Sequence, residues 1–427
     1  MLKSDEKSPS IDRETGLSED RPLRAAAVAA AFLCGCCSFL DMYCTQPLLP
    51  LLERLFRTDE AHVGLTISAS TVGVAVSAAL LALFGERLAR RRTILQAMTA
   101  LATIALLTAT AHTLHELVFW RLLQGLTTPC IFIITIAYIT EEWPPLQVPR
   151  VMSLYVAGTV FGGFCGRFFG GYVAEHFGWQ WVSVVLGVLG LVGAALTAKL
   201  LPPSRDKLRI TNQQILAELV SAAAQKPLSP VEQILANLRS SRLLATFGIG
   251  FCMLFTLVAT FSFVTFYLDA APFHLSATQL SALFAVYLIG LALTVAVGGK
   301  LVHWGLREGM LLAVGCCVVG ILLTLVHSLW VIGAGLSLAS TGVFIAQTCA
   351  NSFLRDAAPM GARVSATGMY ICSYYIGGTV GGVLPAVALR LGGWPACAAL
   401  IALVAATAGV LTIFGWRARP QPDPVPL

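Results

Sequence analysis

The feature that most constrains this chain is a series of long apolar runs. A helix needs about twenty apolar residues to cross the hydrocarbon core of a bilayer, and these runs reach that length. The run 93–111 contains no charged residue, nor does the stretch 310–326 within another run. Twelve runs follow one another along the chain, at residues 25–50, 63–84, 93–111, 116–140, 151–174, 179–201, 243–268, 276–300, 308–327, 329–353, 364–389 and 393–416.

The runs predict helices rather than strands. Only helices and closed barrels span lipid, because every backbone polar group must be paired within the structure. Barrel strands alternate apolar and polar residues, and these runs do not. Charged residues make up 12% of the chain, against about 25% in soluble domains, and the mean hydropathy is +0.78. We therefore expect an all-α membrane protein with twelve transmembrane helices.

Basic residues are divided unevenly between the two sets of loops. If the amino terminus is inside, only Arg54, Arg57 and Arg390 fall in outer loops, while Arg121 and Arg167 fall within runs. The other 23 of the 28 Lys and Arg residues then lie on the inner side, as the positive-inside rule requires. Both termini are predicted to be cytoplasmic. The net charge of +6 is spread over these loops, which argues against a nucleic-acid partner.

A polar, proline-containing segment separates six runs from six. The segment predicts two helical halves joined by a linker. The two ends of the chain are too poor in apolar residues to pack into a core. The expected organisation is a disordered cytoplasmic tail at 1–23, a six-helix half at 24–201, a cytoplasmic linker at 202–241, a second six-helix half at 242–416 and a cytoplasmic tail at 417–427.

The two halves repeat. At an offset of 215 residues, Tyr155 aligns with Tyr370 and Gly162–Gly163 with Gly377–Gly378. Parallel repeats of this kind are typical of transporters in which two halves surround a site near the bilayer midplane. We therefore expect pseudo-symmetric halves.

The twelve cysteines do not indicate a disulfide framework or a metal site. All of them fall within apolar runs, where cysteine acts as a small hydrophobic residue. No group of Cys and His residues has the spacing of a zinc site. The chain also lacks a G-x-S-x-G motif and a P-loop. We expect no metal, no cofactor and no enzymatic activity.

Three ionisable side chains lie well inside predicted spans: Asp41 in the first, Arg121 in the fourth and Arg167 in the fifth. A charge at the centre of a bilayer costs about 2.5–3.5 kcal/mol or more and is a functional hypothesis by default. Together with Gln124, they are expected to serve proton coupling or substrate binding. The alternative is structural. Asp41 would form a salt bridge with either arginine, Arg121 would lie at the outer interface, and Arg167 would pair with a helix carbonyl or with another span.

Glycine recurs at every fourth position of the fifth span. Residues with this spacing lie along one helix face and allow another backbone to approach closely. The predicted packing face consists of Gly158, Gly162, Gly166 and Gly170.

The loop after the second span combines an acid with several arginines. Glu86 is followed by Arg87, Arg90 and Arg91, and these residues are expected to form an inner gate. The alternative is a tight turn whose arginines only set the topology.

These motifs resemble those of the major facilitator superfamily. Arg121, Gln124 and Gly125 match its R-x-x-Q-G signature, the 83–92 loop is similar to its arginine-rich loop, and Asp41 stands nine residues before Pro50 as in drug–proton antiporters. The resemblance is strongest to bacterial inner-membrane arabinose-efflux and drug–proton antiporter permeases. It implies the major facilitator fold, an inner-membrane location, proton coupling that involves Arg121, and a gate at the arginine-rich loop.

Polar and aromatic residues in several spans suggest a cavity for an amphipathic organic molecule, although most of them could equally serve helix packing. The candidates are Tyr43, Gln46, Tyr155, Phe255, Tyr287, Gln347, Asn351, Tyr370 and Tyr374.

The leading functional hypothesis is a proton-coupled exporter of small organic molecules such as drugs or metabolites. One alternative is a proton-coupled importer of an anionic or sugar-like metabolite, bound by Arg121 and Arg167. Another is a membrane sensor that transports nothing. The expected partners are a small-molecule substrate, protons and the lipid bilayer, and the chain is expected to act as a monomer.

Overall fold

The computed structural model describes residues 21–84, 88–143, 147–202, 230–359 and 363–416. Within these ranges all the regular elements are helices. The expected tails, most of the linker, and Glu86 and Arg87 of the expected gate lie outside the described residues.

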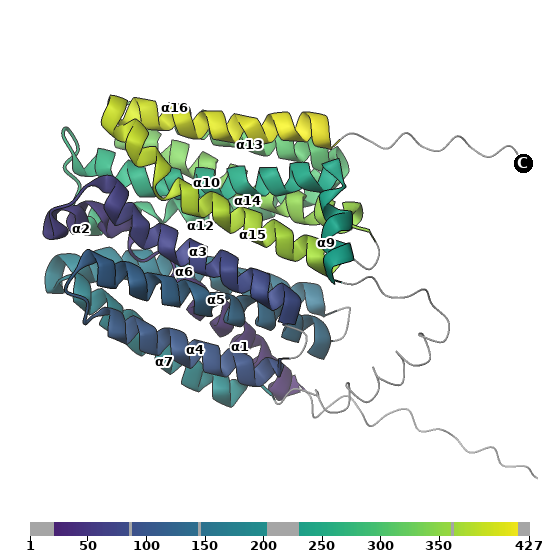
Figure 1. The fold of residues 1–427 in the computed structure, drawn as a ribbon. Helices are drawn as coiled ribbons and strands as arrows, with labels where there is room; N and C mark the ends of the chain where they lie inside the picture. Colours follow the sequence, from purple (N-terminus) through teal and green to yellow (C-terminus); the bar gives the residue numbers. More distant parts are fainter. Residues whose placement is uncertain (1–20, 85–87, 144–146, 203–229, 360–362, 417–427) are drawn as a thin grey trace, which may run out of the picture.

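The first half of the chain forms one helical bundle (Figure 1, lower bundle). Its elements are α1 (Arg21–Leu40), the short 3₁₀ helix η1 (Gln46–Leu48), α2 (Leu49–Phe56), α3 (Glu60–Phe84), α4 (Arg90–Thr108), α5 (Leu114–Glu142), α6 (Val148–Phe177) and α7 (Trp179–Leu200).

The second half forms the other bundle (Figure 1, upper bundle). It is preceded by α9 (Pro230–Leu238), which packs against α10 and α15. Its elements are α10 (Ser241–Asp269), α11 (Ala277–Leu283), α12 (Val286–Trp304), α13 (Leu306–Leu323), α14 (Leu329–Ala357), α15 (Arg363–Gly381) and α16 (Leu384–Gly415).

Each of the twelve predicted spans coincides with one helix or with consecutive helices. Nine of the described helices are long and apolar enough to cross a membrane, and α1 contributes a shorter apolar helix at Ala25–Leu40. The first, eighth and eleventh spans are interrupted, because α1, α11 and α15 each end partway. The twelfth begins at a kink in α16, where Gly392 and Gly393 leave helical geometry. The prediction of twelve helices in two halves is confirmed.

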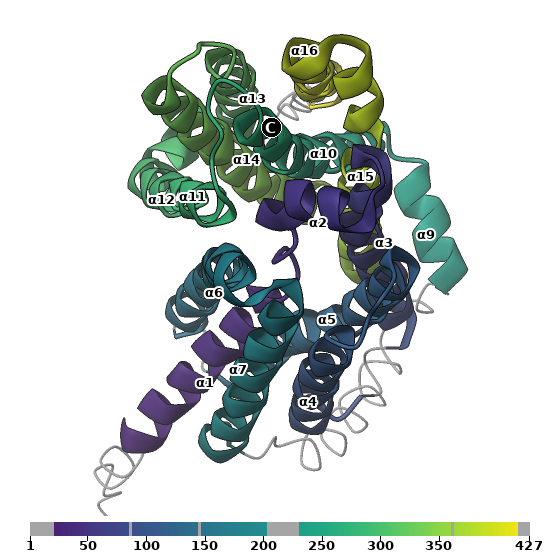
Figure 2. The ribbon, with the colours of Figure 1, turned by 90° about the vertical axis from the view of Figure 1, so that its left-hand side faces the viewer.

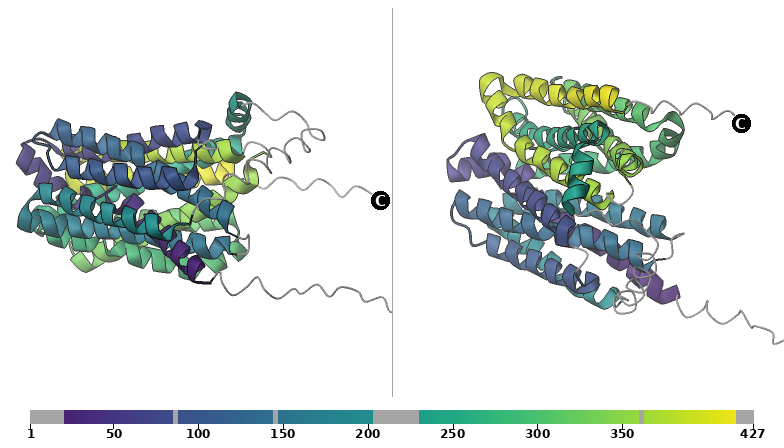
Figure 3. Two further views of the ribbon diagram at one scale, coloured as in Figure 1. Left: turned by 90° about the horizontal axis from the view of Figure 1, so that it is seen from below. Right: turned by 45° about the vertical axis from the view of Figure 1, so that its right-hand side comes forward.

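The helices run roughly side by side along one direction (Figures 1 and 3), so the molecule has two ends. We call the end with α2 and the connection 57–59 the α2 end, and the opposite end, with α9, the α9 end. The view from the α2 end (Figure 2) shows α3 beside α15, and α6 facing α11 and α12, across the boundary between the halves.

The glycine face of α6 packs directly against the backbone of α1. A methyl group added at Gly158, Gly162 or Gly166 would overlap a backbone carbonyl of α1, and the carbonyls met are one helical turn apart. The predicted packing role of this face agrees with that geometry. Gly170 continues the contact beyond the end of α1, against Cys44.

The second half repeats this contact at the same offset. Gly162 lies against Cys36, and Gly377 of α15 lies against Phe251 of α10. Both residues of the second pair stand 215 positions after their counterparts. The offset found in the sequence therefore relates equivalent helix pairs in the structure.

We predict that Gly162→Ala destabilises the protein by about 1–3 kcal/mol, because the added methyl group overlaps the α1 backbone. Gly315 of α13 is the matched control, since a methyl group there meets no atom within 4 Å. Gly315→Ala should be neutral or stabilising by up to about 1 kcal/mol. Melting of the detergent-purified variants measures both effects, and equal melting temperatures would contradict close packing of α1 and α6.

Candidate functional site

The first transmembrane span is broken near its middle. Helix α1 ends at Leu40, residues 41–45 form turns, and η1 follows. Pro47 and Pro50 explain part of this break, because proline has no N–H to donate to the carbonyl four residues earlier. The N–H of Gln46 bonds instead to the carbonyl of Tyr43, three residues back, at 3.1 Å. The break leaves backbone carbonyls at membrane depth that need other donors.

Arg121 supplies those donors. Its side chain is 1% exposed, and its Nη1 donates to the carbonyl of Asp41 at 2.8 Å. Nη2 donates to the carbonyl of Met42, and Nε donates to that of Thr66 in α3 at 3.3 Å. One guanidinium group on α5 thus ties the broken span to two neighbouring helices.

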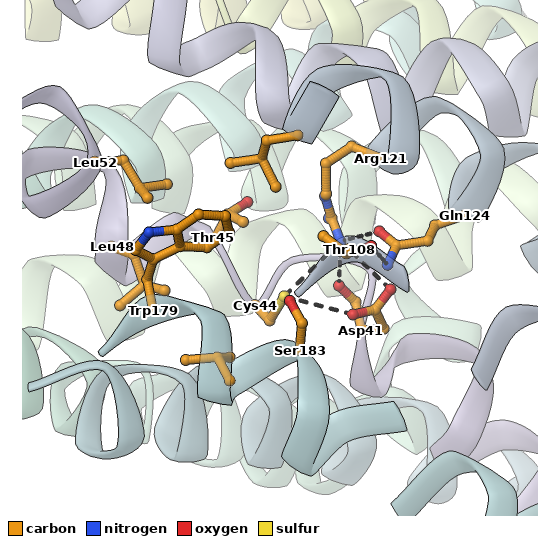
Figure 4. Close-up of a pocket in the computed structure, with 12 residues that line it drawn as sticks. Asp41, Cys44, Thr45, Leu48, Leu52, Thr108, Arg121, Gln124, Trp179 and Ser183 are labelled. Atoms are coloured by element: carbon orange, nitrogen blue, oxygen red, sulfur yellow. Dashed lines mark hydrogen bonds and ion pairs between the residues drawn. The ribbon is translucent and has the colours of Figure 1, made fainter. Parts of the chain in front are cut away.

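Arg121 also pairs with the carboxylate at the break (Figure 4). Its Nη1 lies 3.4 Å from Asp41 Oδ2, and it donates to Gln124 Oε1 at 2.7 Å. Gln124 in turn donates to Thr108 Oγ1 at 3.1 Å, and the thiol of Cys44 lies 3.7 Å from Asp41 Oδ1. Asp41 is the only carboxylate among the buried residues of the described chain. Three of the four residues expected to serve proton coupling or substrate binding, Asp41, Arg121 and Gln124, are therefore grouped around one guanidinium.

Two small voids flank Asp41 inside the first half. Each has a volume of about 10 Å³, close to the space that one water molecule needs. One of them is lined by Thr45, Thr108 and Ser183 (Figure 4), and the buried hydroxyl of Thr45 has no hydrogen-bond partner among the described residues. The surroundings of Asp41 can thus hold water next to the carboxylate.

A much larger cavity, of about 630 Å³, lies between the halves. Arg167 and most of the expected cavity residues line it: Tyr43, Tyr155, Tyr287, Gln347, Asn351, Tyr370 and Tyr374. Gln46 and Phe255 do not, since Gln46 is buried against Arg167 and Phe255 packs against Gly381 of α15.

Asp41 itself lies outside the central cavity. Asp41, Arg121 and Gln124 are absent from its lining and face the interior of the first half. The break explains this placement, because α1 ends at Leu40 and the turns that follow rotate successive side chains away from helical positions. Tyr43, two residues later, does line the cavity.

Sequence reasoning missed two polar residues. Arg355 lines the cavity near the end of α14, and Ser262 of α10 accepts from Gln46 Nε2 at 3.2 Å across the boundary between the halves. Arg355 follows Gln347 and Asn351 at intervals of four, so helical periodicity could have placed it on their face. Ser262 carried no comparable signal.

Arg167 lies in a different environment from Arg121. It is 5% exposed, and it donates from Nε to Gln46 Oε1 at 2.7 Å and from Nη1 to the carbonyl of Gly163 at 2.6 Å. Its guanidinium also lies over the ring of Tyr43, 4.7 Å from the ring centre. The two arginines therefore hold opposite sides of the same broken segment.

The described part of the expected gate makes contacts within the first half. Arg90 pairs with Glu141 of α5 at 3.0 Å, and Arg91 donates to the carbonyls of Leu201 and Ala198 at 2.9 and 2.7 Å.

The halves are closed against each other at the α2 end. Gly171 of α6 packs against Ala277 and Ser281 of α11, with no space for a methyl group. The backbone N–H of Thr278 donates to Glu175 Oε2 at 2.7 Å. These contacts seal one side of the boundary.

Ion pairs join the halves at the same end. Arg54 lies 2.5 Å from Asp269, and Arg390 lies 3.4 Å from Asp59. Hydrogen bonds from the backbone and the ring of His62, with a further contribution from Arg390, hold the pKa of Asp59 below its ordinary value. Asp59 therefore stays charged at neutral pH, as the pair requires.

Comparison with known proteins agrees with the fold. The family model of the Major Facilitator Superfamily matches residues 31–270 and 266–427, and the chain belongs to this family. It is an integral membrane transporter of the major facilitator type.

The chain is similar to other transporters along most of their length. The chain is 28% identical to the inner membrane transport protein YnfM of Escherichia coli (strain K12), over 88% of this chain and 87% of that protein. It is 26% identical to the uncharacterized MFS-type transporter YybF of Bacillus subtilis (strain 168), over 86% and 89%. The solved structure of the nucleoside transporter NupG shares the fold, with a TM-score of 0.71, 13% identity and coverage of 92% and 100%.

We predict that Arg121→Lys destabilises the protein by at least about 2 kcal/mol, because one ammonium group cannot replace the bonds to Asp41, Met42 and Thr66 together. The control is Arg54→Lys at the exposed pair with Asp269, which should change stability by less than about 1 kcal/mol. Thermal melting in detergent measures both variants. A wild-type melting temperature for Arg121→Lys would show that the broken span does not depend on the guanidinium.

Proposed function

We propose that the chain is a proton-coupled exporter of small organic molecules and that it acts as a monomer. The observation that carries the proposal is the buried Asp41–Arg121 pair at the break in the first span. A single buried carboxylate with an adjacent water-sized void is suited to gain and lose a proton. The spacing from Asp41 to Pro50 resembles that of drug–proton antiporters, which favours this direction.

The broken segment offers a physical link between proton and substrate. Asp41 begins the segment beside Arg121, while Tyr43 and Gln46 extend from it to the cavity wall and to Arg167. Protonation of Asp41 removes the charge that attracts Arg121 and weakens the hold on the segment. Because the same segment positions Tyr43 and Gln46, its movement would change the cavity at Arg167.

The positive-inside rule assigns the α2 end to the outer side, so the cavity in this structure would be closed to the outside. Both termini and the linker would then be cytoplasmic.

A cysteine at Thr110, in the connection between α4 and α5 near the α2 end, should react with an impermeant thiol reagent in intact cells. One at Arg239, next to α9, should not, and the reverse pattern would invert the orientation. Wild type is the background control.

The inner gate is part of the same proposal. When the carrier opens outward, Glu86 and Arg87, together with Arg90 and Arg91, would close the α9 end. The bonds of Arg90 to Glu141 and of Arg91 to Leu201 hold the start of α4 against other helices of the first half, which supports a gate at this end.

A second candidate is an importer that carries a proton together with an organic anion. The observation that favours it is the position of Arg167, a cation in the cavity wall, while Asp41 lies outside the cavity. Proton and substrate then occupy different sites and need not compete. Bound negative charge at Arg167 would even favour a proton at Asp41.

Transport in proteoliposomes, with a panel of candidate organic compounds and an imposed pH gradient, tests both candidates. An exporter moves substrate against the proton flow, and the importer moves it with the flow. We predict that Asp41→Asn abolishes gradient-driven transport in either case but retains exchange of substrate, because the amide imitates the protonated acid.

The control for this experiment is Glu308→Gln, at an exposed carboxylate in the first turn of α13, which should transport like wild type. Gradient-driven accumulation by Asp41→Asn at the wild-type rate would refute coupling through this residue.

A further inference from the structure

Arg167 is the buried cation that the Asp41–Arg121 pair does not neutralise. Among the described residues, no carboxylate oxygen lies within 4.0 Å of its guanidinium. Its two hydrogen-bond acceptors, Gln46 Oε1 and the carbonyl of Gly163, are neutral. A buried charge without a counter-ion is costly to maintain, so a charge of opposite sign at this position would be strongly favoured.

Three aromatic rings hold this guanidinium in place. The ring centres of Tyr43, Tyr287 and Phe284 lie 4.7, 4.9 and 5.2 Å from it. Rings at these distances stabilise the cation through their π faces but, unlike a carboxylate, supply no negative charge. The guanidinium has five N–H donors, and no bond from Nη2 to a described residue is found. The side chain is therefore fixed in position with donors to spare.

The position of Arg167 along α6 suits a substrate anchor. Gly171, one helical turn further along, packs against Ser281 in the seal at the α2 end. Arg167 therefore lies at the closed end of the cavity, one turn from the contact that must open. A ligand held there would meet the opposite solution as soon as the seal separates.

The rest of the cavity wall matches an anion with an apolar body. The lining includes two cations, Arg167 and Arg355, and no carboxylate among the described residues. Most of the remaining surface is aromatic or aliphatic, with Gln347 and Asn351 as neutral polar groups. The volume of about 630 Å³ falls in the range usual for sites that bind small molecules.

We propose that Arg167 binds the anionic group of the transported molecule and that the substrates are amphipathic organic acids, with one carboxylate on an aromatic or aliphatic body. Two N–H groups of the guanidinium fork match the two oxygens of a carboxylate. The aromatic wall then covers the apolar body. The proposal rests on the proposed function only in taking the central cavity as the substrate site, and it holds for either direction of transport.

Equilibrium binding to the purified protein in detergent tests it without any proton gradient. The probes are 2-naphthoate and its neutral analogue 2-naphthamide, which differ in charge and share the ring system. We expect wild type to bind naphthoate in preference to naphthamide. Arg167→Gln should lose affinity for naphthoate about tenfold or more and leave naphthamide unchanged. Arg239→Gln, which removes a cation next to α9, is the control and should bind as wild type.

Arg167→Lys guards against misfolding of the Gln variant, because it keeps the charge and loses the planar fork. It should show reduced preference for naphthoate together with wild-type binding of naphthamide. Equal binding of the two probes by wild type, or an unchanged preference in Arg167→Gln, would overturn the proposal. Displacement of naphthoate by equimolar chloride would also overturn it, since the site would then select inorganic anions.

Binding that fails in this assay while Asp41-dependent transport of other compounds persists would refute the anion site alone. Binding that succeeds while transport shows no dependence on a pH gradient would refute the proton coupling alone.

Discussion

The contact between Arg121 and the broken first span is the interaction on which the rest of the site depends. A helix interrupted at membrane depth exposes carbonyl groups that lipid cannot satisfy. The guanidinium of Arg121 donates hydrogen bonds to the carbonyls of Asp41 and Met42. It also balances the charge of Asp41, the only buried carboxylate of the described chain. The break can persist because of this contact. As a result, Asp41 faces the interior of the first half while Tyr43, two residues later, faces the central cavity.

The site also depends on the glycine face of α6, which packs against α1. Close approach of α6 to α1 brings Arg167 beside Tyr43 and Gln46, so the cavity cation touches the same segment that Arg121 holds from the other side. The equivalent contact in the second half has no such charges, because Gly382 stands at the position related to Arg167 by the offset of 215. The backbone packing is symmetric, while the buried charged residues Asp41, Arg121 and Arg167 all belong to the first half.

The sequence was sufficient to predict the spans and the glycine contact, because they follow from hydropathy and helical spacing. The cost of a buried charge indicated that Asp41 needs a cationic partner but left Arg121 and Arg167 as alternatives. The sequence was not sufficient to place Asp41 outside the cavity, since helical periodicity ceases at Leu40 and cannot assign a face to the turns that follow. The contact from Gln46 to Ser262 is also beyond prediction, because it joins residues 216 positions apart and depends on how the two halves dock. Arg355 could have been predicted, because it follows Asn351 by four residues and so lies on the same helix face.

The central claim is that a proton at Asp41 and a substrate at Arg167 act on one another through residues 41–46. Calorimetric titration of 2-naphthoate into the purified protein, in buffers of different ionisation enthalpy, counts the protons exchanged on binding. The account predicts that wild type exchanges protons as it binds, whereas Asp41→Asn binds the probe without exchange. An equal proton count in both proteins, or binding by wild type with no exchange at all, would contradict the link between the two sites.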